Sequence, residues 1–367
     1  MGVNKDSQRN VIFIHDDAAP LFAESRGKRF GGAEVQVFLL AKELAKSKRL
    51  HVIFVTTHEM PKEVNGVTFL KISPDECTVD GIAARLVDFG VKMGTAAIVQ
   101  QIPSEETVIA AELSGKLDGL FIYQVSSDWE VKDPCKMRDV RAKYLEGVYG
   151  SNVIVTQHDV QLKSLREHSD HLAMTIPNGI RFPRQRPSRS GEYVLWSGRC
   201  APVKRPWHYL ELARDFPEEK FLMMLMPVFN YRELYRAVTS VAKRISNLEI
   251  FETSFADSQS YYDDAKLLIS TSEYEGFPNT FLQAAKGSTP TLSFKVDPGS
   301  IFGDSGSYKF AGGSRAKMEE QLRLLLVNRE PLSSMGKDAF YYAKERYDIS
   351  KTAKMYEDLI FDLHKEN

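Results

Sequence analysis

The chain has 367 residues, enough for two domains, because a single hydrophobic core rarely grows beyond about 250–300 residues. Its residues are 43% hydrophobic and 26% charged, as in soluble globular proteins, and a net charge of −1 argues against a surface built throughout for nucleic acid. The three cysteines, Cys77, Cys135 and Cys200, form no Cys-x-x-Cys pair, so free thiols in a reducing compartment are expected. The sequence shows neither a signal-peptide pattern nor an apolar run of about 20 residues, which predicts a cytoplasmic protein.

Short apolar runs recur along the whole chain and do not alternate with polar residues. Such runs predict parallel strands that are buried on both faces. Amphipathic stretches such as 33–46 separate many of them and predict helices between the strands. The predicted fold class is therefore α/β. The expected strands are 11–14, 51–56, 96–100, 120–125, 152–155, 193–196, 220–225, 248–251, 267–270 and 290–294.

Segment 181–192 interrupts this pattern. It contains four arginines and two prolines and has no apolar periodicity. We interpret it as a solvated linker between two α/β halves; contact of its arginines with an anionic partner is the alternative.

Several common site motifs do not occur. The 23 glycines never form Gly-x-Gly, so the dinucleotide fingerprint is missing. The sequence also contains no P-loop, no Gly-x-Ser-x-Gly elbow and no His-Glu-x-x-His metal motif. These absences argue against the commonest nucleotide-binding, hydrolase and zinc-protease classes.

Gly31 and Gly32 open the predicted helix 33–46, shortly after the first strand. Glycines let a ligand approach the backbone, and a helix N-terminus offers unpaired N–H groups to an anion. Arg26, Lys28 and Arg29 precede them. An ordinary structural turn is the alternative.

Arg199 and Lys204 follow the strand 193–196 in the sequence SGRCAPVK. In open α/β sheets, ligands collect at the carboxyl ends of strands. An arginine gripping bidentately and a lysine acting as a point charge suit the oxygens of a diphosphate. A pair of exposed surface cations is the alternative.

The sequence SEYEGFPNTFLQAAKG follows the strand 267–270. Glu275 and Gly276 make a turn, Pro278 fits the first helical position, a helix is expected over 279–286, and Gly287 ends it. An ionised glutamate at this place accepts hydrogen bonds from sugar hydroxyls.

These motifs, in this order, resemble those of family-four retaining glycosyltransferases. SGRCAPVK is similar to the family's G-R-x-x-x-x-K loop, and EGFPNTFLQ is similar to its E-x7-E region, with Gln283 in place of the second acid. IPNG at 176–179, GGAE at 31–34 and the last helix are similar to further family features. The resemblance implies the GT-B architecture, two Rossmann-like domains with parallel sheets facing a central cleft. It divides the chain into an acceptor-side domain (1–180), the linker (181–192), a nucleotide-sugar domain (193–342) and a helix that crosses back (343–367).

The resemblance also implies a function. It is the retaining transfer of a hexose from a nucleotide-diphosphate sugar, most readily a UDP-sugar, to a lipid, saccharide or small-molecule acceptor, with no metal and no other cofactor. The implied catalytic residues are Glu275, Arg199 and Lys204. The implied donor-binding residues are Gly31, Gly32, Gly276, Phe277, Pro278, Asn279, Thr280 and Gln283.

Two departures from the family pattern keep alternatives open. Gln283 lacks the charge of the family's second acid, and the stretch 123–128 lacks the histidine that the family often places near the sugar. Asp128 is the candidate on the acceptor or sugar side. The alternatives are a sugar-nucleotide-binding protein without transferase activity and a sugar-nucleotide epimerase.

The expected partners are the nucleotide-sugar donor and an unidentified acceptor, and no nucleic acid is expected to bind. The protein is expected to be a monomer or a homodimer. We interpret the basic segments 26–29 and 46–49 as a solvated surface; contact with anionic lipid at the inner face of a membrane, or with a phosphorylated acceptor, is the alternative.

Overall fold

The computed structural model describes residues 8–23, 30–132, 144–188, 190–328 and 330–366. Arg26, Lys28, Arg29 and Cys135 lie outside these residues. The chain forms two compact units: Met1–Gly179 together with Ile349–Asn367, and Ile180–Asp348.

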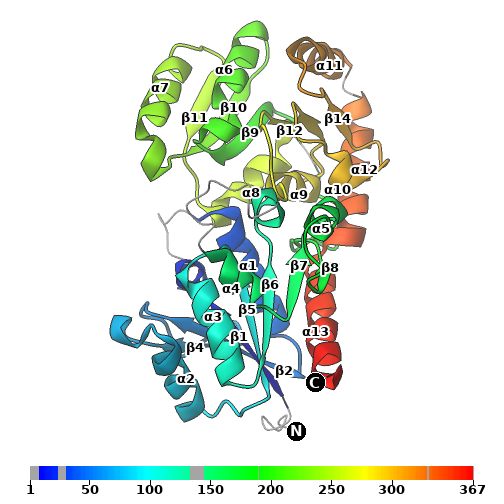
Figure 1. Cartoon of the computed structure of the whole chain (residues 1–367). Helices are drawn as coiled ribbons and strands as arrows, with labels where there is room; N and C mark the ends of the chain where they lie inside the picture. Colours follow the sequence, from blue (N-terminus) through cyan, green and yellow to red (C-terminus); the bar gives the residue numbers. More distant parts are fainter. Residues whose placement is uncertain (1–7, 24–29, 133–143, 189, 329, 367) are drawn as a thin grey trace. The chain divides into compact units, whose positions relative to one another are not determined.

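In the described part of the first unit, a sheet of eight strands has the order β3-β4-β2-β1-β5-β6-β7-β8 (Figure 1). All neighbours pair in parallel except β3 and β4. The strands are β1 (Arg9–Ile14), β2 (Leu50–Thr56), β3 (Glu63–Val64), β4 (Val67–Lys71), β5 (Ala96–Gln101), β6 (Leu120–Gln124), β7 (Val153–Thr156) and β8 (Ala173–Thr175).

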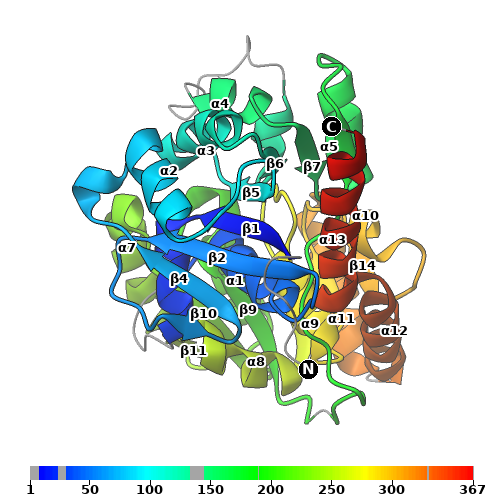
Figure 2. The same ribbon diagram turned by 90° about the horizontal axis from the view of Figure 1, so that it is seen from below.

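Helices cover both faces of this sheet, and Figure 2 shows α2 and α3 on the side opposite α1. One face packs against η2 (Asp16–Ala23), α1 (Gly32–Leu44) and α13 (Ile349–Glu366). The other packs against α2 (Val79–Asp88), α3 (Glu105–Lys116), α4 (Leu145–Tyr149) and α5 (Asp159–Arg166). Two short 3-10 helices, η3 (Pro74–Glu76) and η4 (Asp128–Val131), complete the unit's described helices.

The second unit has a parallel sheet whose described strands follow the order β11-β10-β9-β12-β13-β14. They are β9 (Tyr193–Arg199), β10 (Phe221–Met226), β11 (Leu248–Phe251), β12 (Ala265–Ser270), β13 (Thr291–Ser293) and β14 (Tyr308–Phe310). The helices are η7 (Pro202–Lys204), α6 (Pro206–Asp215), η8 (Phe229–Tyr231), α7 (Arg232–Ala242), α8 (Phe255–Asp263), α9 (Asn279–Lys286), α10 (Gly299–Phe302), α11 (Arg315–Val327) and α12 (Glu330–Tyr347). Two apolar layers, one on each face of the sheet, form its core.

The IPNG stretch of the sequence is explained by packing within the first unit. Ile176 is fully buried, and a Cβ on Gly179 would lie 2.6 Å from Thr352 Oγ1 and 2.8 Å from Ile349 Cα. Only glycine therefore lets the start of α13 approach this backbone so closely.

The predicted α/β class with parallel sheets is confirmed. Helix α1 begins at Gly32 and ends at Leu44, close to the expected 33–46. The short strands β3, β4, β8 and β14 were not expected. Segment 181–192 is grouped with the second unit, where Lys344 Nζ donates to the carbonyl oxygens of Pro183 and Arg184 at 2.9 and 2.6 Å. No described helix is both long enough and apolar enough to span a bilayer.

Candidate functional site

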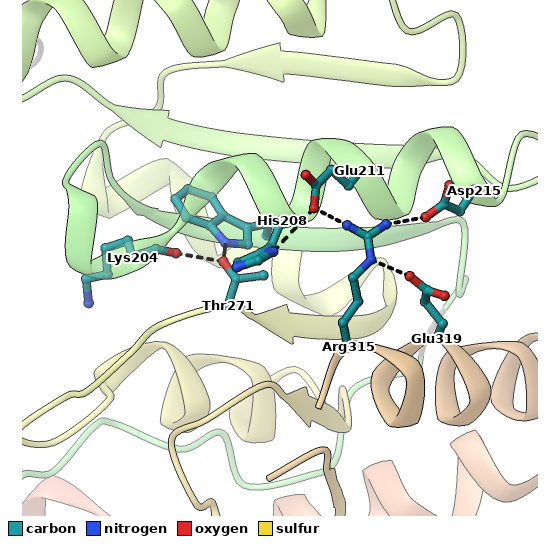
Figure 3. Close-up of polar contacts among 8 residues, drawn as sticks. Lys204, His208, Glu211, Asp215, Thr271, Arg315 and Glu319 are labelled. Atoms are coloured by element: carbon teal, nitrogen blue, oxygen red, sulfur yellow. Dashed lines mark hydrogen bonds and ion pairs between the residues drawn. The ribbon is translucent and has the colours of Figure 1, made fainter. Parts of the chain in front are cut away.

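The loop after β9 is held in place by the loop after β12 (Figure 3). Thr271 Oγ1 donates to the Lys204 carbonyl at 2.7 Å and accepts from Trp196 Nε1 at 2.9 Å. The Glu273 amide donates to the Val203 carbonyl at 2.8 Å. Two adjacent strands thus end in loops that are bonded to each other, at the edge where α/β sheets bind ligands.

Lys204 and Glu275 form an ion pair at this edge. Lys204 Nζ lies 2.5 and 2.6 Å from the two carboxylate oxygens of Glu275, and Ser272 Oγ donates to Glu275 at 2.7 Å. The lysine and glutamate side chains are 19% and 16% exposed, so water still reaches both. The structure therefore brings together two of the three predicted catalytic residues, as direct partners.

Arg199 is at the last position of β9 and is exposed. Among the described residues, its guanidinium has no hydrogen bond or ion pair. This cation is therefore available for an anionic ligand without breaking an existing contact.

A second ion pair supports the same two loops. Arg205 pairs with Glu273, which also pairs with Lys295. Arg205 has φ 47° and ψ 54°, a left-handed conformation that costs a non-glycine residue about 1–2 kcal/mol. We infer that the ion pair offsets part of this strain and keeps Lys204 in its place.

Helix α6, which follows Arg205, is anchored at its other end by charged residues (Figure 3). Arg315 on α11 contacts Glu211 and Asp215 on α6, the latter at 2.7 Å, and Glu319 on its own helix at 2.5 Å. His208 Nδ1 lies 3.3 Å from Glu211 Oε2. The side chains are one-third to nearly half exposed apart from His208, so the network contributes to positioning more than to stability.

Helix α9 follows Glu275 with the expected bounds, Asn279–Lys286, but its ends differ from the prediction. Pro278 is the N-cap residue and does not occupy the first helical position. Gly287 ends the helix with φ −75°, and the left-handed residue is Ser288 with φ 61°. Gly287 is required for another reason, because a Cβ there would lie 2.8 Å from the Tyr262 carbonyl oxygen.

Gln283 lies on α9 and faces α8. Its Nε2 donates to Ser258 Oγ at 3.4 Å, and its backbone carbonyl accepts from Gln259 Nε2 at 3.2 Å. Within the described residues no hydrogen bond joins Gln283 to Glu275. The remaining predicted donor-binding residues of this unit line the same turn and helix start: Gly276, Phe277, Pro278, Asn279 and Thr280.

Gly31 and Gly32 form the start of α1 in the first unit, as predicted. A Cβ on Gly31 would lie 2.5 Å from Glu34 Oε2, so the carboxylate of Glu34 covers this turn. A carboxylate at this place repels phosphate. The predicted approach of a donor phosphate to Gly31 and Gly32 stays untested, and Glu34 argues against it.

Asp128 has a partner that the sequence reasoning missed. Its Oδ1 accepts from Gln161 Nε2 at 2.9 Å and lies 3.5 Å from His158 Nε2. His158 caps α5 directly after β7, and its side chain is 13% exposed. The sequence contains a signal for this residue, because His158 follows the carboxyl end of the predicted strand 152–155, where ligands of α/β sheets collect.

The segment 46–49 is mostly paired. Lys46 lies 2.7 Å from Glu43, and Arg49 lies 3.4 Å from Glu357 on α13. Membrane contact through this segment stays a prediction. Among the described residues, no three His, Cys, Asp or Glu side chains are grouped as metal ligands are.

No protein-family model and no curated protein matches the sequence. Solved structures, in contrast, are similar over nearly the whole chain. HepE (Alr3699) of Anabaena, solved with UDP, superposes with a TM-score of 0.75 at 11% identity over 96% of this chain and 100% of its own. Sucrose-phosphate synthase of Thermosynechococcus elongatus gives 0.77 at 13% identity over 98% and 100%. The pneumococcal O-GlcNAc transferase GtfA, solved with UDP and GlcNAc, gives 0.60 at 13% identity over 77% and 59%. The chain therefore has the α/β GT-B fold that these glycosyltransferases share.

Proposed function

We propose that this protein is a glycosyltransferase that moves a hexose from a UDP-sugar to an acceptor, with retention of the anomeric configuration and without a metal ion. The observation that carries the proposal is the Lys204–Glu275 ion pair at the ends of the neighbouring strands β9 and β12, ahead of α9. Arg199, at the last position of β9, adds a cation that has no partner among the described residues. Solved proteins of the same fold contain UDP, UDP-glucose or GlcNAc, which supports this donor class.

The chemistry requires positive charge where the sugar–phosphate bond breaks. Negative charge grows on the leaving diphosphate, and cations fixed in advance stabilise it. In the proposal Arg199 and Lys204 have this role, and the start of α9, with a partial positive charge of about half a unit, assists them. These groups do the work for which many transferases use a divalent cation.

Glu275 can accept further hydrogen bonds while it is paired with Lys204. A carboxylate offers about four lone-pair sites, and among the described residues Glu275 accepts hydrogen bonds from Lys204 and Ser272. We assign the remaining sites to hydroxyls of the donor sugar. The pair then holds the sugar and its leaving group together, because each partner binds one side of the breaking bond.

Gln283 is assigned to the ribose of the nucleotide. Its side-chain amide can donate a hydrogen bond to one ribose hydroxyl and accept one from the other. These bonds are weaker than those of a carboxylate, because the amide carries no charge. Its side chain is half-buried next to α8.

The test is a panel of UDP-, GDP- and ADP-sugars. A ligand present at a hundred times its dissociation constant stabilises the folded protein by about 2.7 kcal/mol, which thermal melting detects. We expect UDP-sugars to raise the melting temperature most and to be hydrolysed slowly when no acceptor is present. NMR of the released sugar reports its anomeric configuration, and added EDTA should leave the rate unchanged.

Each result that contradicts the proposal is distinct. If no nucleotide sugar raises the melting temperature, the transferase function is wrong. Binding without transfer or hydrolysis identifies a sugar-nucleotide-binding protein. The sequence feature that favours this alternative is the uncharged Gln283 in place of the family's second acid. Conversion of the bound UDP-sugar to its epimer identifies an epimerase.

A further inference from the structure

Four neighbouring strands of the first unit's sheet end in polar side chains on one face. The residues are His15 after β1, Gln101 of β5, Gln124 of β6 and Gln157 after β7, and we name them the polar row. Side chains alternate between the faces of a strand, so each shares its face with the residue two positions before it. Those residues are Phe13, Val99, Ile122 and Val155, and all four belong to the apolar layer that packs against α1 and α13.

The polar row is buried but incompletely bonded. His15 is 4% exposed and Gln101 is 1% exposed, yet both ring nitrogens of His15 and both amide atoms of Gln101 lack hydrogen-bond partners among the residues that the structure describes. Gln157 Oε1 also lacks one, whereas Gln124 Nε2 and Gln157 Nε2 donate to Asn178 Oδ1 at 3.1 and 3.3 Å. Buried polar groups in native proteins are nearly always bonded, so a cluster of five unpartnered atoms indicates a function or a bound molecule.

In the described part of the chain, the charged groups that act on His15 are negative. They are Glu34 of α1 and Asp16 and Asp17 of η2. Burial lowers the pKa of His15 despite these carboxylates, so the ring is neutral at physiological pH. A neutral imidazole and amides next to carboxylates disfavour an anionic ligand.

The rim of this edge is in contact with solvent. Gly32 at the start of α1 is exposed, and the Asp128 side chain is 37% exposed beside His158.

We propose that the polar row binds an uncharged molecule with several hydroxyl groups. Each hydroxyl both donates and accepts, and the unpartnered atoms comprise donors and acceptors side by side. The proposal rests on the proposed function in one respect: under that function, this polyol is the acceptor of the sugar. The carboxylates of Glu34, Asp16 and Asp17 disfavour a phosphorylated acceptor, because like charges repel.

The experiment is saturation-transfer NMR on the full chain without any nucleotide sugar. The probes are glycerol, myo-inositol, the methyl glycosides of glucose, galactose, mannose and N-acetylglucosamine, and glucose 6-phosphate as the anionic comparison. We expect signals from one or more neutral probes and none from the sugar phosphate. Absence of binding by all neutral probes, or equal binding of the sugar phosphate, would overturn the proposal.

Gln101→Leu tests the residues themselves. It removes two unpartnered polar atoms and keeps the shape, so the unliganded protein should melt at the same temperature or roughly 2–4 °C higher. Binding of the neutral probe should fall at least about fivefold, since two of its hydrogen-bond partners are lost. The matched control is Gln321→Leu, in the second unit, where Gln321 Oε1 is also unpartnered; it should leave probe binding unchanged.

Two outcomes of this variant contradict the proposal. If Gln101→Leu binds the probe as the natural protein does, the polar row is not the site. If it melts several degrees lower and no neutral probe binds to the natural protein, the row holds structural water only. Binding of UDP-sugars is measured separately by melting, so a failure of the polar row and a failure of the proposed function are distinguished.

Discussion

Replacement of Lys204 by alanine tests the centre of the candidate site. The change removes a cation from Glu275, whose side chain is 16% exposed, and leaves that carboxylate with the hydrogen bond from Ser272. Exposed ion pairs contribute about 0–1 kcal/mol, whereas breaking a fully buried pair costs about 3–5 kcal/mol. For a pair at this intermediate depth, we expect Lys204→Ala to lower the free energy of unfolding by about 1–2 kcal/mol.

The expected effect on turnover is larger than the effect on stability. One fixed group that stabilises charge in the transition state contributes about 3 kcal/mol, which corresponds to about a hundredfold in rate. The assay measures turnover of the UDP-sugar at saturation, corrected for the folded fraction from urea unfolding. Lys295→Ala is the matched control, because Lys295 pairs with Glu273 nearby but is 50% exposed. We expect the control to keep more than half of the natural turnover.

A double variant separates stability from catalysis. In Lys204→Met with Glu275→Gln, both charges of the pair are removed, so no unpaired carboxylate is left and stability should recover most of its loss. Turnover should not recover, since the leaving group still lacks its cation. If Lys204→Ala and Lys295→Ala have equal turnover, Lys204 does not act on the leaving group and the mechanism is wrong.

Three further changes have defined outcomes. Gln283→Glu should tighten UDP binding by about 1 kcal/mol, roughly fivefold by calorimetry, because a carboxylate binds ribose hydroxyls more strongly than an amide does. Weaker binding would show that Gln283 does not contact the ribose. Arg205→Ala should unfold more easily in urea than Arg205→Gly by about 1 kcal/mol, since both lose the ion pair with Glu273 but only alanine is strained at φ 47°. Burial raises the pKa of the Glu106 carboxyl from 4.5 to about 7. The protonated side chain therefore stabilises the fold by at most about 3 kcal/mol. This contribution is complete below about pH 4.5 and is lost as the pH rises through about 7. Urea unfolding of Glu106→Gln should show a smaller loss of stability over that pH range than the natural protein; an equal loss would contradict the assignment.

The strands were predictable from the sequence because parallel strands buried on both faces appear as unbroken apolar runs. The core strand Val153–Thr156 and the site helix Asn279–Lys286 were found within about a residue for this reason. Strand β8 was missed because it has three residues, Ala173–Thr175, and its pairing with β7 depends on the rest of the sheet. A pattern of that length has no period to recognise.

The position of Lys204 and Glu275 at one edge of the sheet was predictable from the sequence, but their contact was not. Lys204 and Glu275 were placed at the same edge by the rule of strand ends, yet they are 71 residues apart and their direct ion pair depends on the order of β9 and β12. The polar row was not predicted at all. Its members are adjacent because β1 pairs with β5 as well as with β2, and sequence order alone does not reveal that crossover.

The strand ends of the two units carry opposite chemistry, and this difference restricts what each binds. In the second unit, Arg199 has no partner among the described residues, and Lys204 is paired with Glu275. In the first unit, Glu34 lies over the glycine turn, and Asp16 and Asp17 act on His15, whose ring nitrogens have no partner in the described part of the chain. Within the described residues, the charges at the strand ends of the second unit therefore favour a diphosphate, and those at the strand ends of the first unit disfavour one. Under the two proposals, the cations of the second unit bind the anionic part of the donor, and the polar row of the first unit binds an uncharged hydroxyl compound.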